Sequence, residues 1–506
     1  MKRGFTLIEL LAVIVILAII ALIATPIVLD IIEDSKESAN IQSINSLVDM
    51  AEMYATSNES TGNLYDKVID KIKGTKPDNG TIYVNKKGEV ALALKYNNKC
   101  YVKAYDSNKI TQNKDENCIV PVDYLMVVDT TNGETQKVFN SEITKSQVEK
   151  IITVSTNEVP VDVIGSFDVS ENQNESIMAW YKDEDNNGLY ELYIGQDGGV
   201  KANPDSTKLF NYYIAVTSMD LSNLDTSNVT NMNGIFNYCK SLENIDLSNF
   251  DTSNVINMQA FFQRCEKLQN LDLSRFNTSN VTNMNGMFNQ CQSLEQLNVS
   301  NFDTSNVTTM ISMFQKCIKL EILDLSNFDT SKVIGMRYLF NKCSSLQTLD
   351  LSNFNTSKVT DMKAMFQDCS NLRFLDLSNF DTNNVTTMQA LFFGCTSLET
   401  INLSSFNTSN VTNMYAMFYN CNSLNELNLS NFNTSKTEDS SYMFDNTTNL
   451  KTININNADF TKVTEYPYMF RDSGVTNIIV KDENAKAFIE ARLTDASITG
   501  TIVTIV

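Results

Sequence analysis

Residues 268–293, LQNLDLSRFNTSNVTNMNGMFNQCQS, form one unit of a repeat that decides the fold of most of the chain. Phenylalanine recurs with a 26-residue step from Phe210 to Phe470, which makes eleven turns including a degenerate one at each end. A fixed period of this length is the sequence signature of a protein built from stacked repeats. Eight cysteines keep the same step: Cys239, Cys265, Cys291, Cys317, Cys343, Cys369, Cys395 and Cys421.

Each unit has two parts with different patterns. The first part reads L-x-x-L-x-L, as in Leu268, Leu271 and Leu273, which is the strand signature of leucine-rich repeats. Stacking such units predicts a right-handed solenoid whose parallel strands line one face about 4.8 Å apart. The second part places apolar residues at helix-like spacing and predicts a short convex turn: Val281, Met284, Met287, Phe288 and Cys291.

The repeat resembles the BspA-like leucine-rich repeats of bacterial surface proteins, in the form that carries LDLSNFDTSNVTNM..MF..C. The resemblance covers residues 214–480, and residues 140–213 resemble that family's N-terminal cap. The last units depart from the pattern, because Thr447 and Ser473 replace cysteine and one residue is missing before Val475. Residues 481–506 contain ENAKAFIEARL, which predicts a capping helix. Loss of the repeat pattern at the ends is expected, because the terminal repeats of a finite stack must cap it.

The column of cysteines suggests disulfides or a metal site. Neighbouring units at about 4.8 Å exceed the Cβ separation of roughly 3.8 Å that a disulfide prefers. The chain has no C-x-x-C pair that would chelate a metal. We therefore expect a buried column of small apolar thiols. Two columns of methionines, from Met232 to Met414 and through Met287, Met313 and Met365, are likewise expected in the core.

On the strands, the residue between the two inward leucines points to the concave surface. Carboxylates this close disfavour one another's charge, which predicts somewhat raised pKa values unless a cation or a complementary ligand binds. Both readings of the surface, a solvated polar face and a ligand-binding face, remain open. The candidate binding residues are Asp220, Asp246, Asp272, Asn298, Asp324, Asp350, Asp376 and Asn402, with Asn428 and Asn454 continuing the column.

The segment DEDNNG, which begins at Asp183, matches the first six positions of an EF-hand calcium loop. The twelfth position is Ile194, so the bidentate glutamate is missing. A β-turn is favoured, because Asn187-Gly188 between apolar strands is a hairpin signal. Asp183, Asp185 and Asn187 are thus a weak calcium candidate only. We expect no metal centre and no cofactor elsewhere.

Residues 4–26, GFTLIELLAVIVILAIIALIATP, follow Lys2 and Arg3 and are long enough to cross a bilayer. A secretory signal peptide would need a better cleavage site than ALIATP. A plain membrane anchor leaves Glu9 unexplained, since an unpaired carboxylate in lipid costs at least ~2.5 kcal/mol.

The start KRGFTLIELL resembles the leader of type IV prepilins. The resemblance implies that a prepilin peptidase removes residues 1–4 after Gly4 and that the new amine of Phe5 is methylated. It also implies that Glu9 neutralises the Phe5 amine of a neighbouring pilin subunit in a filament core. Pro26 then stands where such helices often kink. The expected partners are the peptidase, other pilin subunits and the membrane.

The apolar spacing continues to about residue 56, so we expect an assembly helix over residues 5–56. Residues 57–120 alternate apolar and polar side chains around KKG and YNN, which predicts a small antiparallel head. Residues 121–139 would be a linker. Cys100 and Cys118 are interpreted as a disulfide outside the cytoplasm, with two buried free thiols as the alternative.

The composition of the chain argues against several classes of function. The chain has 506 residues, 60 acidic against 39 basic, and a net charge of -21, which makes nucleic acid unlikely as the main partner. It has no histidine, so Ser-His-Asp hydrolases and His-ligated zinc sites are excluded. The fold class is α/β: a long pilin helix with a small head, then the solenoid.

These features predict a non-enzymatic cell-surface protein, a minor or tip subunit of a type IV pilus-like filament. It would pass from the cytoplasmic membrane to the bacterial surface or pilus. There its solenoid would adhere to a host, cell or matrix ligand, a protein or a glycan. We expect a minor subunit because a solenoid of nearly 300 residues is hard to place on every subunit. The alternatives are a DNA-uptake pilin and a membrane-anchored surface enzyme or binding protein outside any filament.

Overall fold

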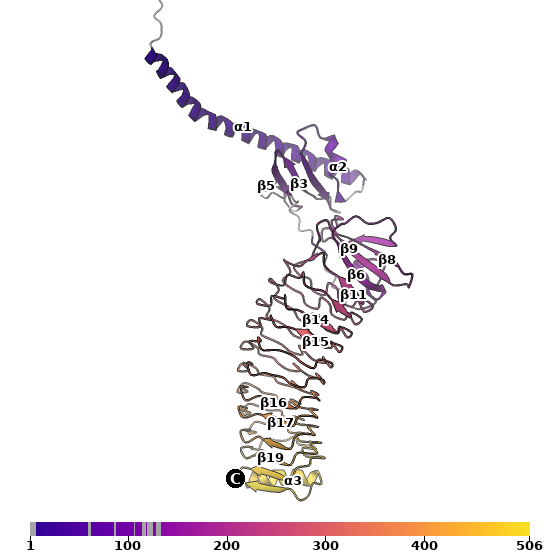
Figure 1. Ribbon diagram of the computed structural model, residues 1–506, viewed down its shortest axis with the longest axis vertical. Helices are drawn as coiled ribbons and strands as arrows, with labels where there is room; N and C mark the ends of the chain where they lie inside the picture. The colour runs from indigo at the N-terminus through magenta and orange to yellow at the C-terminus, as the bar shows by residue number, and fades with distance from the viewer. Residues whose placement is uncertain are drawn as a thin grey trace, which may run out of the picture. The chain divides into compact units, whose positions relative to one another are not determined.

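The computed structural model describes residues 7–58, 62–85, 88–105, 107–113, 118, 125–127 and 133–506 (Figure 1). Within the first helix, the side chains of residues 7–13, 19–21, 23, 24, 26, 27, 30 and 58 lie outside the described part, as do those of residues 113 and 140. The chain divides into two compact units. One comprises residues 1–124 with 170–176, and the other residues 125–169 with 177–506.

The first unit begins with helix α1 (Leu7–Asn58), whose 52 residues are close to the predicted 5–56. The helix continues without interruption through position 26, so Pro26 lies inside it. Only its second half has a core-facing side, where Ile44, Leu47 and Ala51 are fully buried. In the described part of the chain, no helix is long and apolar enough to cross a membrane.

The head of the first unit is a five-stranded antiparallel sheet in the order β1-β2-β3-β4-β5. One side of the sheet packs on α1, where Ile82, Leu92 and Leu94 meet Leu47 in one cluster. The predicted turn at YNN joins β3 to β4 with Asn97 and Asn98 in positive φ. The elements are β1 (Gly62–Asn63), α2 (Tyr65–Val68), η1 (Ile69–Lys71), β2 (Asn79–Val84), β3 (Val90–Tyr96), β4 (Lys99–Lys103) and β5 (Thr111–Asn113).

The second unit begins with a six-stranded sheet in the order β13-β11-β6-β9-β8-β7. Its central strand β6 pairs in parallel with β11, the first strand of the solenoid, so the cap and the coils share one sheet. Strands β10 and β12 form a separate, short parallel pair. The elements are η2 (Val138–Asn140), η3 (Lys145–Gln147), β6 (Val148–Val154), β7 (Gly165–Asp168), β8 (Met178–Lys182), β9 (Tyr190–Gly195), β10 (Val200–Lys201), β11 (Ser218–Asp220), β12 (Leu224–Asp225) and β13 (Asn244–Ile245).

The strand side of the solenoid is an interrupted parallel ladder. Residues 322–324 and 348–350 have the strand motif but form no assigned strand. The continuous backbone pairing lies elsewhere, at one bridge residue per coil that joins eleven coils from Asp205 to Glu465. The remaining strands are β14 (Asn270–Asp272), β15 (Gln296–Asn298), β16 (Phe374–Asp376), β17 (Thr400–Asn402), β18 (Glu426–Asn428), β19 (Thr452–Ile455), β20 (Asn477–Val480) and β21 (Ile502–Ile505).

The opposite, turn side of each coil is a run of β-turns, and it differs from the helix-like segment that the apolar spacing favours. Two turns close with N–H to C=O bonds three residues back, from Met287 to Met284 and from Cys291 to Phe288. Their third residues have positive φ, 61° at Gly286 and 66° at Gln290, as in type II turns. Alternate N–H groups donate to the next coil at 2.7–3.2 Å: Met284 to Thr309, Gly286 to Ile311, Phe288 to Met313 and Gln290 to Gln315.

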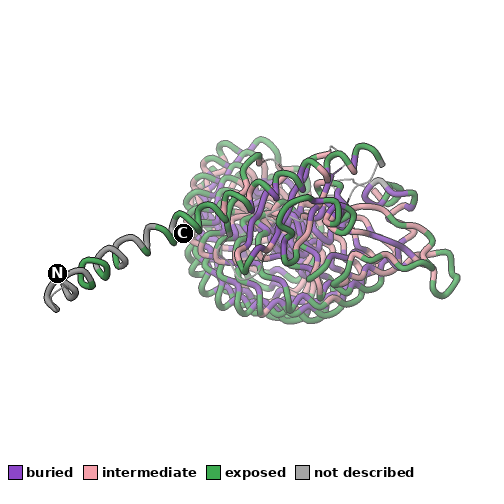
Figure 2. The backbone as a smooth tube through the Cα atoms, turned by 90° about the horizontal axis from the view of Figure 1, so that it is seen from above, coloured by how far each residue is buried: buried purple, intermediate pink, exposed green. Residues whose placement is uncertain are grey.

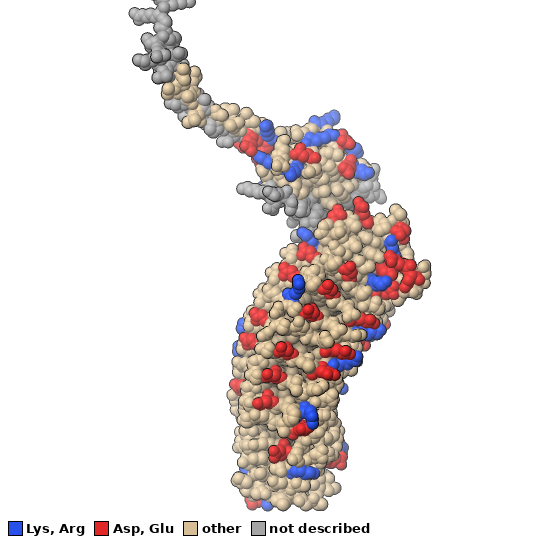
Figure 3. All heavy atoms as spheres, viewed as in Figure 1, with Lys and Arg blue, Asp and Glu red and all other residues tan. Residues whose placement is uncertain are grey.

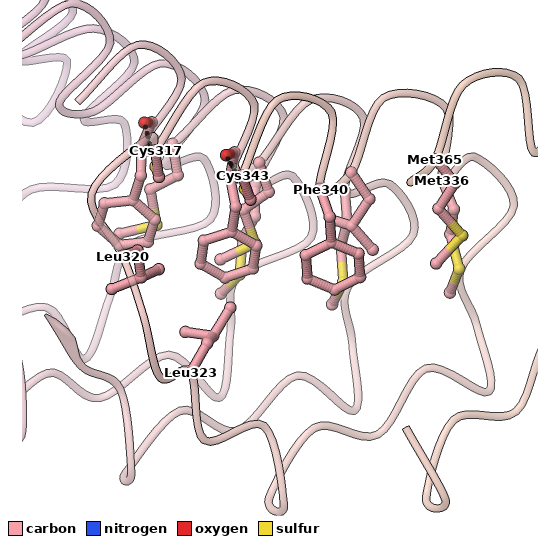
Figure 4. Close-up of a cluster of buried hydrophobic side chains, with 14 of the residues drawn as sticks. Cys317, Leu320, Leu323, Met336, Phe340, Cys343 and Met365 are labelled. Carbon is pink, nitrogen blue, oxygen red and sulfur yellow. Dashed lines mark hydrogen bonds between the residues drawn. The ribbon is translucent and has the colours of Figure 1, made fainter. Parts of the chain in front are cut away.

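The solenoid core is built from columns of identical or similar residues, and buried residues lie inside an exposed rim (Figure 2). The phenylalanine of each coil stacks on that of the next, as between Phe314 and Phe340, whose centroids are 5.8 Å apart. Figure 4 shows Cys317 and Cys343 pointing the same way in adjacent coils. The predicted core columns of Cys and Met are therefore buried.

The C-terminal end is closed by helix α3 (Glu483–Asp495), as predicted from ENAKAFIEARL. Asp482 caps the helix by accepting the N–H of Ala485 at 2.8 Å. Ile489 and Leu493 are buried on the last coil. A final strand, β21, pairs with β20 and extends the sheet β18-β19-β20-β21 beyond the repeats.

Candidate functional site

The candidate site is the strand face, the column of side chains that the sequence places between the inward leucines. Every member from Asp220 to Asn428 is exposed, and Asn454 is half-buried. The neighbouring leucines turn into the core, as Leu271 and Leu273 do beside Asp272. Across coils the column is close enough for contact, because the Asn298 amide donates to Asp272 Oδ1 at 3.2 Å. The strand face comprises Asp220, Asp246, Asp272, Asn298, Asp324, Asp350, Asp376, Asn402, Asn428 and Asn454.

Each of these side chains also has a local structural role. Its Oδ1 accepts the backbone N–H of the residue two positions on, at 2.9–3.2 Å in every coil, which ends the strand in an Asx-turn. Asn and Asp fill this role equally well, because both present an Oδ1 acceptor. One oxygen of each carboxylate therefore already accepts a hydrogen bond from the protein's own backbone.

The expectation of raised carboxylate pKa values on this face is wrong. The backbone N–H and the hydroxyl of the following serine hold the pKa of five aspartates below their usual value. Repulsion between neighbours is a minor effect, as between Asp350 and Asp324. The effect of the local donors is larger because they lie at hydrogen-bond distance, whereas solvent screens the repulsion between charges on this exposed face. The five residues are Asp246, Asp272, Asp324, Asp350 and Asp376.

Two large apolar side chains stand exposed beside this column. Ile322 is 75% exposed and Phe374 is 55% exposed, in the repeat position two residues before Asp324 and Asp376. Ile322 lines an open depression of about 550 Å³ together with Leu297 and a Glu295–Lys319 ion pair of 2.8 Å. Neither residue is among the binding residues predicted from the sequence. The signal that could have found them is an apolar residue at a repeat position that other coils fill with Ser, Asn, Gln, Thr or Glu.

Charge is divided between the two sides of the coils. In the ten units that begin at residues 216 to 450, the first ten positions carry 17 acidic and three basic residues. These positions include the strand face and the loop after it, and Figure 3 shows acidic side chains recurring in rows along the visible face. The other sixteen positions of the first six units carry ten basic and three acidic residues. The strand side is therefore strongly acidic, whereas the turn side of the first coils is basic.

The ladder cysteines are free, fully buried thiols. Each Sγ lies 3.0–3.2 Å from the carbonyl oxygen of the phenylalanine in the preceding coil, as Cys343 does from Phe314. Burial raises the pKa of the Cys343 thiol to about 12, so the group stays protonated. The thiols are thus weak hydrogen-bond donors in the core, and not nucleophiles.

The DEDNNG segment is a turn whose carboxylates are used by its own backbone. Asp183 accepts the N–H groups of Asn187 and Gly188 at 3.0 and 3.1 Å, and Asp185 accepts the amide of the Asn187 side chain at 3.0 Å. Gly188 has φ 85°. Among the described residues, no group of three or more acidic, cysteine or histidine side chains is placed to hold a metal ion.

The N-terminal candidates fall outside this description. Gly4 and Phe5 precede the first described residue, and the side chains of Glu9 and Pro26 are not described. In the head, Cys100 and Cys118 are joined by a disulfide behind the sheet, where Ala91, Ala93 and Val102 surround them. The interpretation of residues 1–26 therefore depends on their sequence.

Two protein families match this chain. The prokaryotic N-terminal methylation motif matches residues 1–25. The family described as Mycoplasma protein of unknown function, DUF285, matches residues 205–298, 291–375 and 368–482, more than half of the chain in total. The chain belongs to the DUF285 family. In this member, the repeats of the solenoid follow a prepilin-type start.

Both matched families, the prepilin-type motif and the repeat domain, are of non-enzymatic kinds. Together they indicate a membrane-associated, surface-exposed bacterial protein. The methylation motif implies processing by a prepilin peptidase and assembly with other pilins. Among solved structures, the functional domain of InlJ from Listeria monocytogenes, described as including a cysteine ladder, is similar at 15% identity. The match covers 54% of this DUF285 chain and 70% of that one, with a TM-score of 0.14. No curated protein sequence matches the chain.

Proposed function

We propose that this protein is a minor or tip subunit of a type IV pilus-like filament that presents its solenoid outside the cell as an adhesin. The observation that carries the proposal is the presence of a prepilin-type start and DUF285 repeats on one chain. The first supplies a route into a filament, and the second an extended recognition surface. The bulk of the solenoid favours a minor position in the filament.

Binding is assigned to the strand face. It is the broad surface on which side chains of one type recur in register, and it includes the exposed Ile322 and Phe374. Repeat surfaces of this kind bind through many modest contacts that add up along the stack. The acidic strand face fits a protein or glycan ligand that presents hydrogen-bond donors or cations. An apolar patch on the ligand would contact the exposed Ile322 and Phe374.

Assembly is tested by Glu9→Ala. Membrane insertion and removal of the four-residue leader should continue, because neither step uses the charge. Entry into filaments should fail, since the variant cannot neutralise the Phe5 amine of its neighbour. Immunoblots of sheared filaments against whole cells measure the difference, and Asp34→Ala, an exposed carboxylate further along the same helix, is the control. Wild-type amounts of the Glu9 variant in sheared filaments would refute the pairing.

Recognition is tested by changing Asp272, Asp324, Asp350 and Asp376 together to Asn. Folding should survive, because Asn298 and Asn402 already fill the same Asx-turn. Attachment of displaying cells to arrayed glycans and matrix proteins should fall, because four charges leave the face.

The matched control changes four aspartates five residues further on in their units, Asp251, Asp303, Asp329 and Asp381, to Asn. It removes the same charge from the adjoining loop and should leave attachment unchanged. Equal loss in both variants would indicate a general charge effect. Loss only in the control would place the site off the strand face.

DNA uptake is the second candidate function, and one observation favours it. The basic turn side of the first six units, which includes Arg264, Lys316 and Lys342, is suited to a polyanion despite the net charge of the chain. DNA binding that falls steeply with salt and is lost in the triple alanine variant of these residues would support it. Absence of DNA binding at low salt would remove it.

A further inference from the structure

The cap of the solenoid contains a lysine whose side chain is fully buried. Lys145 begins the 3₁₀ helix η3 and is 0% exposed, an unusual position for a residue that almost always keeps its amine in water. Its amine points to Asn211, 66 residues further on, which is also 0% exposed and directly follows the first phenylalanine of the stack, Phe210. The contact joins the segment that leads into the solenoid to its first coil.

The two side chains are in direct contact. Nζ of Lys145 lies 2.7 Å from Oδ1 of Asn211. Because a carbonyl bond is ~1.23 Å long, the amide carbon of Asn211 is no more than about 3.9 Å from the amine. The backbone fixes both residues, since Lys145 N–H donates to Gln136 at 2.9 Å and Asn211 N–H donates to Lys208 at 3.0 Å. Such fixed proximity is worth several orders of magnitude in rate.

We propose that Lys145 and Asn211 form an intramolecular isopeptide bond. The bond between Nζ of Lys145 and Cγ of Asn211 forms, and the bond between Cγ and Nδ2 of Asn211 breaks. The amine attacks in its neutral form, and the leaving amide nitrogen takes one proton from it and departs as ammonia. Atoms and charge balance, and the reaction requires no oxidant or reductant.

Burial distinguishes this pair from two others of the same kind. Lys332 Nζ lies 2.6 Å from Asn306 Oδ1, and Lys436 Nζ lies 2.7 Å from Asn410 Oδ1, but both contacts are on the exposed surface. An exposed lysine side chain stays mobile and shares its amine with water, whereas burial holds the Lys145 amine against the Asn211 amide. The Lys145 amine lies 5.4 Å from the ring centroid of Tyr213. We therefore assign the cross-link to the buried pair alone.

The bond would close a covalent loop around strands β6 to β10. Tension applied to the chain ahead of Lys145 would then pass directly to the first coil at Asn211, and the cap sheet would not be peeled away strand by strand. The inference does not depend on assembly into a filament or on the identity of any ligand.

Mass spectrometry of the reduced, full-length protein tests the proposal. The wild-type protein should be lighter than its processed sequence by about 17 Da, the mass of one ammonia. Proteolysis should yield one branched peptide that joins Lys145 to Asn211. Lys145→Met and Asn211→Ala should each restore the full mass, while Lys332→Met and Lys436→Met should keep the deficit.

A wild-type protein of full mass would overturn the proposal, whether or not the variants fold. So would a deficit of this size that maps to another pair of residues. Because the measurement uses the purified protein, its failure would leave the proposed adhesin function untouched, and failed filament assembly would leave the cross-link untouched.

Discussion

At the scale of the single residue, the ladder cysteines combine a core position with a hydrogen bond. The small thiol fits beside the phenylalanine stack, and its hydrogen reaches a carbonyl of the preceding coil, as from Cys369 to Phe340 at 3.2 Å. Where Thr447 replaces cysteine, its hydroxyl donates to Phe444 in its own coil at 2.7 Å and meets Ser473 of the next coil at 2.9 Å. The polar replacement at the last coils therefore keeps the column hydrogen-bonded.

This arrangement predicts a specific pattern of thiol labelling. In the native protein at pH 8, alkylation should modify none of the eight ladder thiols, because they are buried and burial raises their pKa. Unfolded without reductant, the protein should gain eight labels, and with reductant ten, since Cys100 and Cys118 are then released. Intact mass counts the labels. Rapid labelling of the native protein would contradict the buried column, and ten labels without reductant would contradict the disulfide.

Part of the residue-scale chemistry could be read from the sequence and part could not. The burial of the cysteines follows from their period. The direction of the aspartate pKa shifts was predicted wrongly, although the motif D-L-S contains the serine that donates to each carboxylate. Repulsion along the column predicts a raised pKa, whereas the hydrogen bonds of the local Asx-turn lower it. Local geometry decided the outcome, since a hydrogen bond at 3.0 Å outweighs a screened charge in the next coil.

At the scale of the element, a buried threonine joins each coil to the next. Thr330 is 0% exposed; its hydroxyl donates to the carbonyl of Asn355 at 2.9 Å and accepts the N–H of the same residue at 2.8 Å. The donation recurs in nine consecutive coils. One side chain thus satisfies both backbone groups at a point where no strand is assigned.

Thr330→Val should therefore destabilise the solenoid by about 2 kcal/mol, because it keeps the shape but leaves a buried donor and acceptor of Asn355 unpaired. Thr330→Ser retains the hydroxyl and should cost less, since it loses only a methyl group. Urea unfolding followed by circular dichroism measures both variants. If serine proved the more damaging replacement, the methyl packing and not the hydrogen bonds would be the dominant contribution.

The strand part of each unit was predictable at this scale, whereas the turn side was not. Spacings of three and four residues fit a helix, but they also fit successive β-turns, as at Met284, Met287 and Phe288. The distinguishing signal was the residue with positive φ: Gly234 and Gly286 occupy the same repeat position. Tyr338 and Ala364 adopt the same conformation in other coils, which obscures the signal.

At the scale of the whole molecule, the ends of the solenoid determine whether it remains a single stack. The cap sheet covers the first coil through β6 and β11. At the other end β21 pairs with β20, and α3 covers the core through Ile489 and Leu493. The helix was predicted from its sequence. The final strand was not, because TIVTIV lacks the repeat pattern and its partner is set by the fold.

Removal of residues 499–506 should make the protein associate with itself. The deletion takes away β21 and exposes the unpaired edge of β20, a parallel strand with buried Ile478 and Val480. Sedimentation velocity over a range of concentrations should show species larger than a monomer. Ile489→Ala, which weakens α3 but keeps β21, should lower stability and remain monomeric. Association of both variants alike would indicate that general destabilisation is the cause.

The hydrogen bonds between coils are the same along the middle of the solenoid, and this affects how the length of the solenoid can be inherited. Because each coil makes the same contacts to its neighbours through the same backbone positions, any coil of the middle stretch can follow any other. Unequal recombination between two repeats of the gene would therefore add or remove whole coils in frame, and each event would change the reach of the solenoid by about 4.8 Å. Length becomes a heritable trait that varies in steps without a loss of fold, so that populations of the bacterium can differ in how far the solenoid extends.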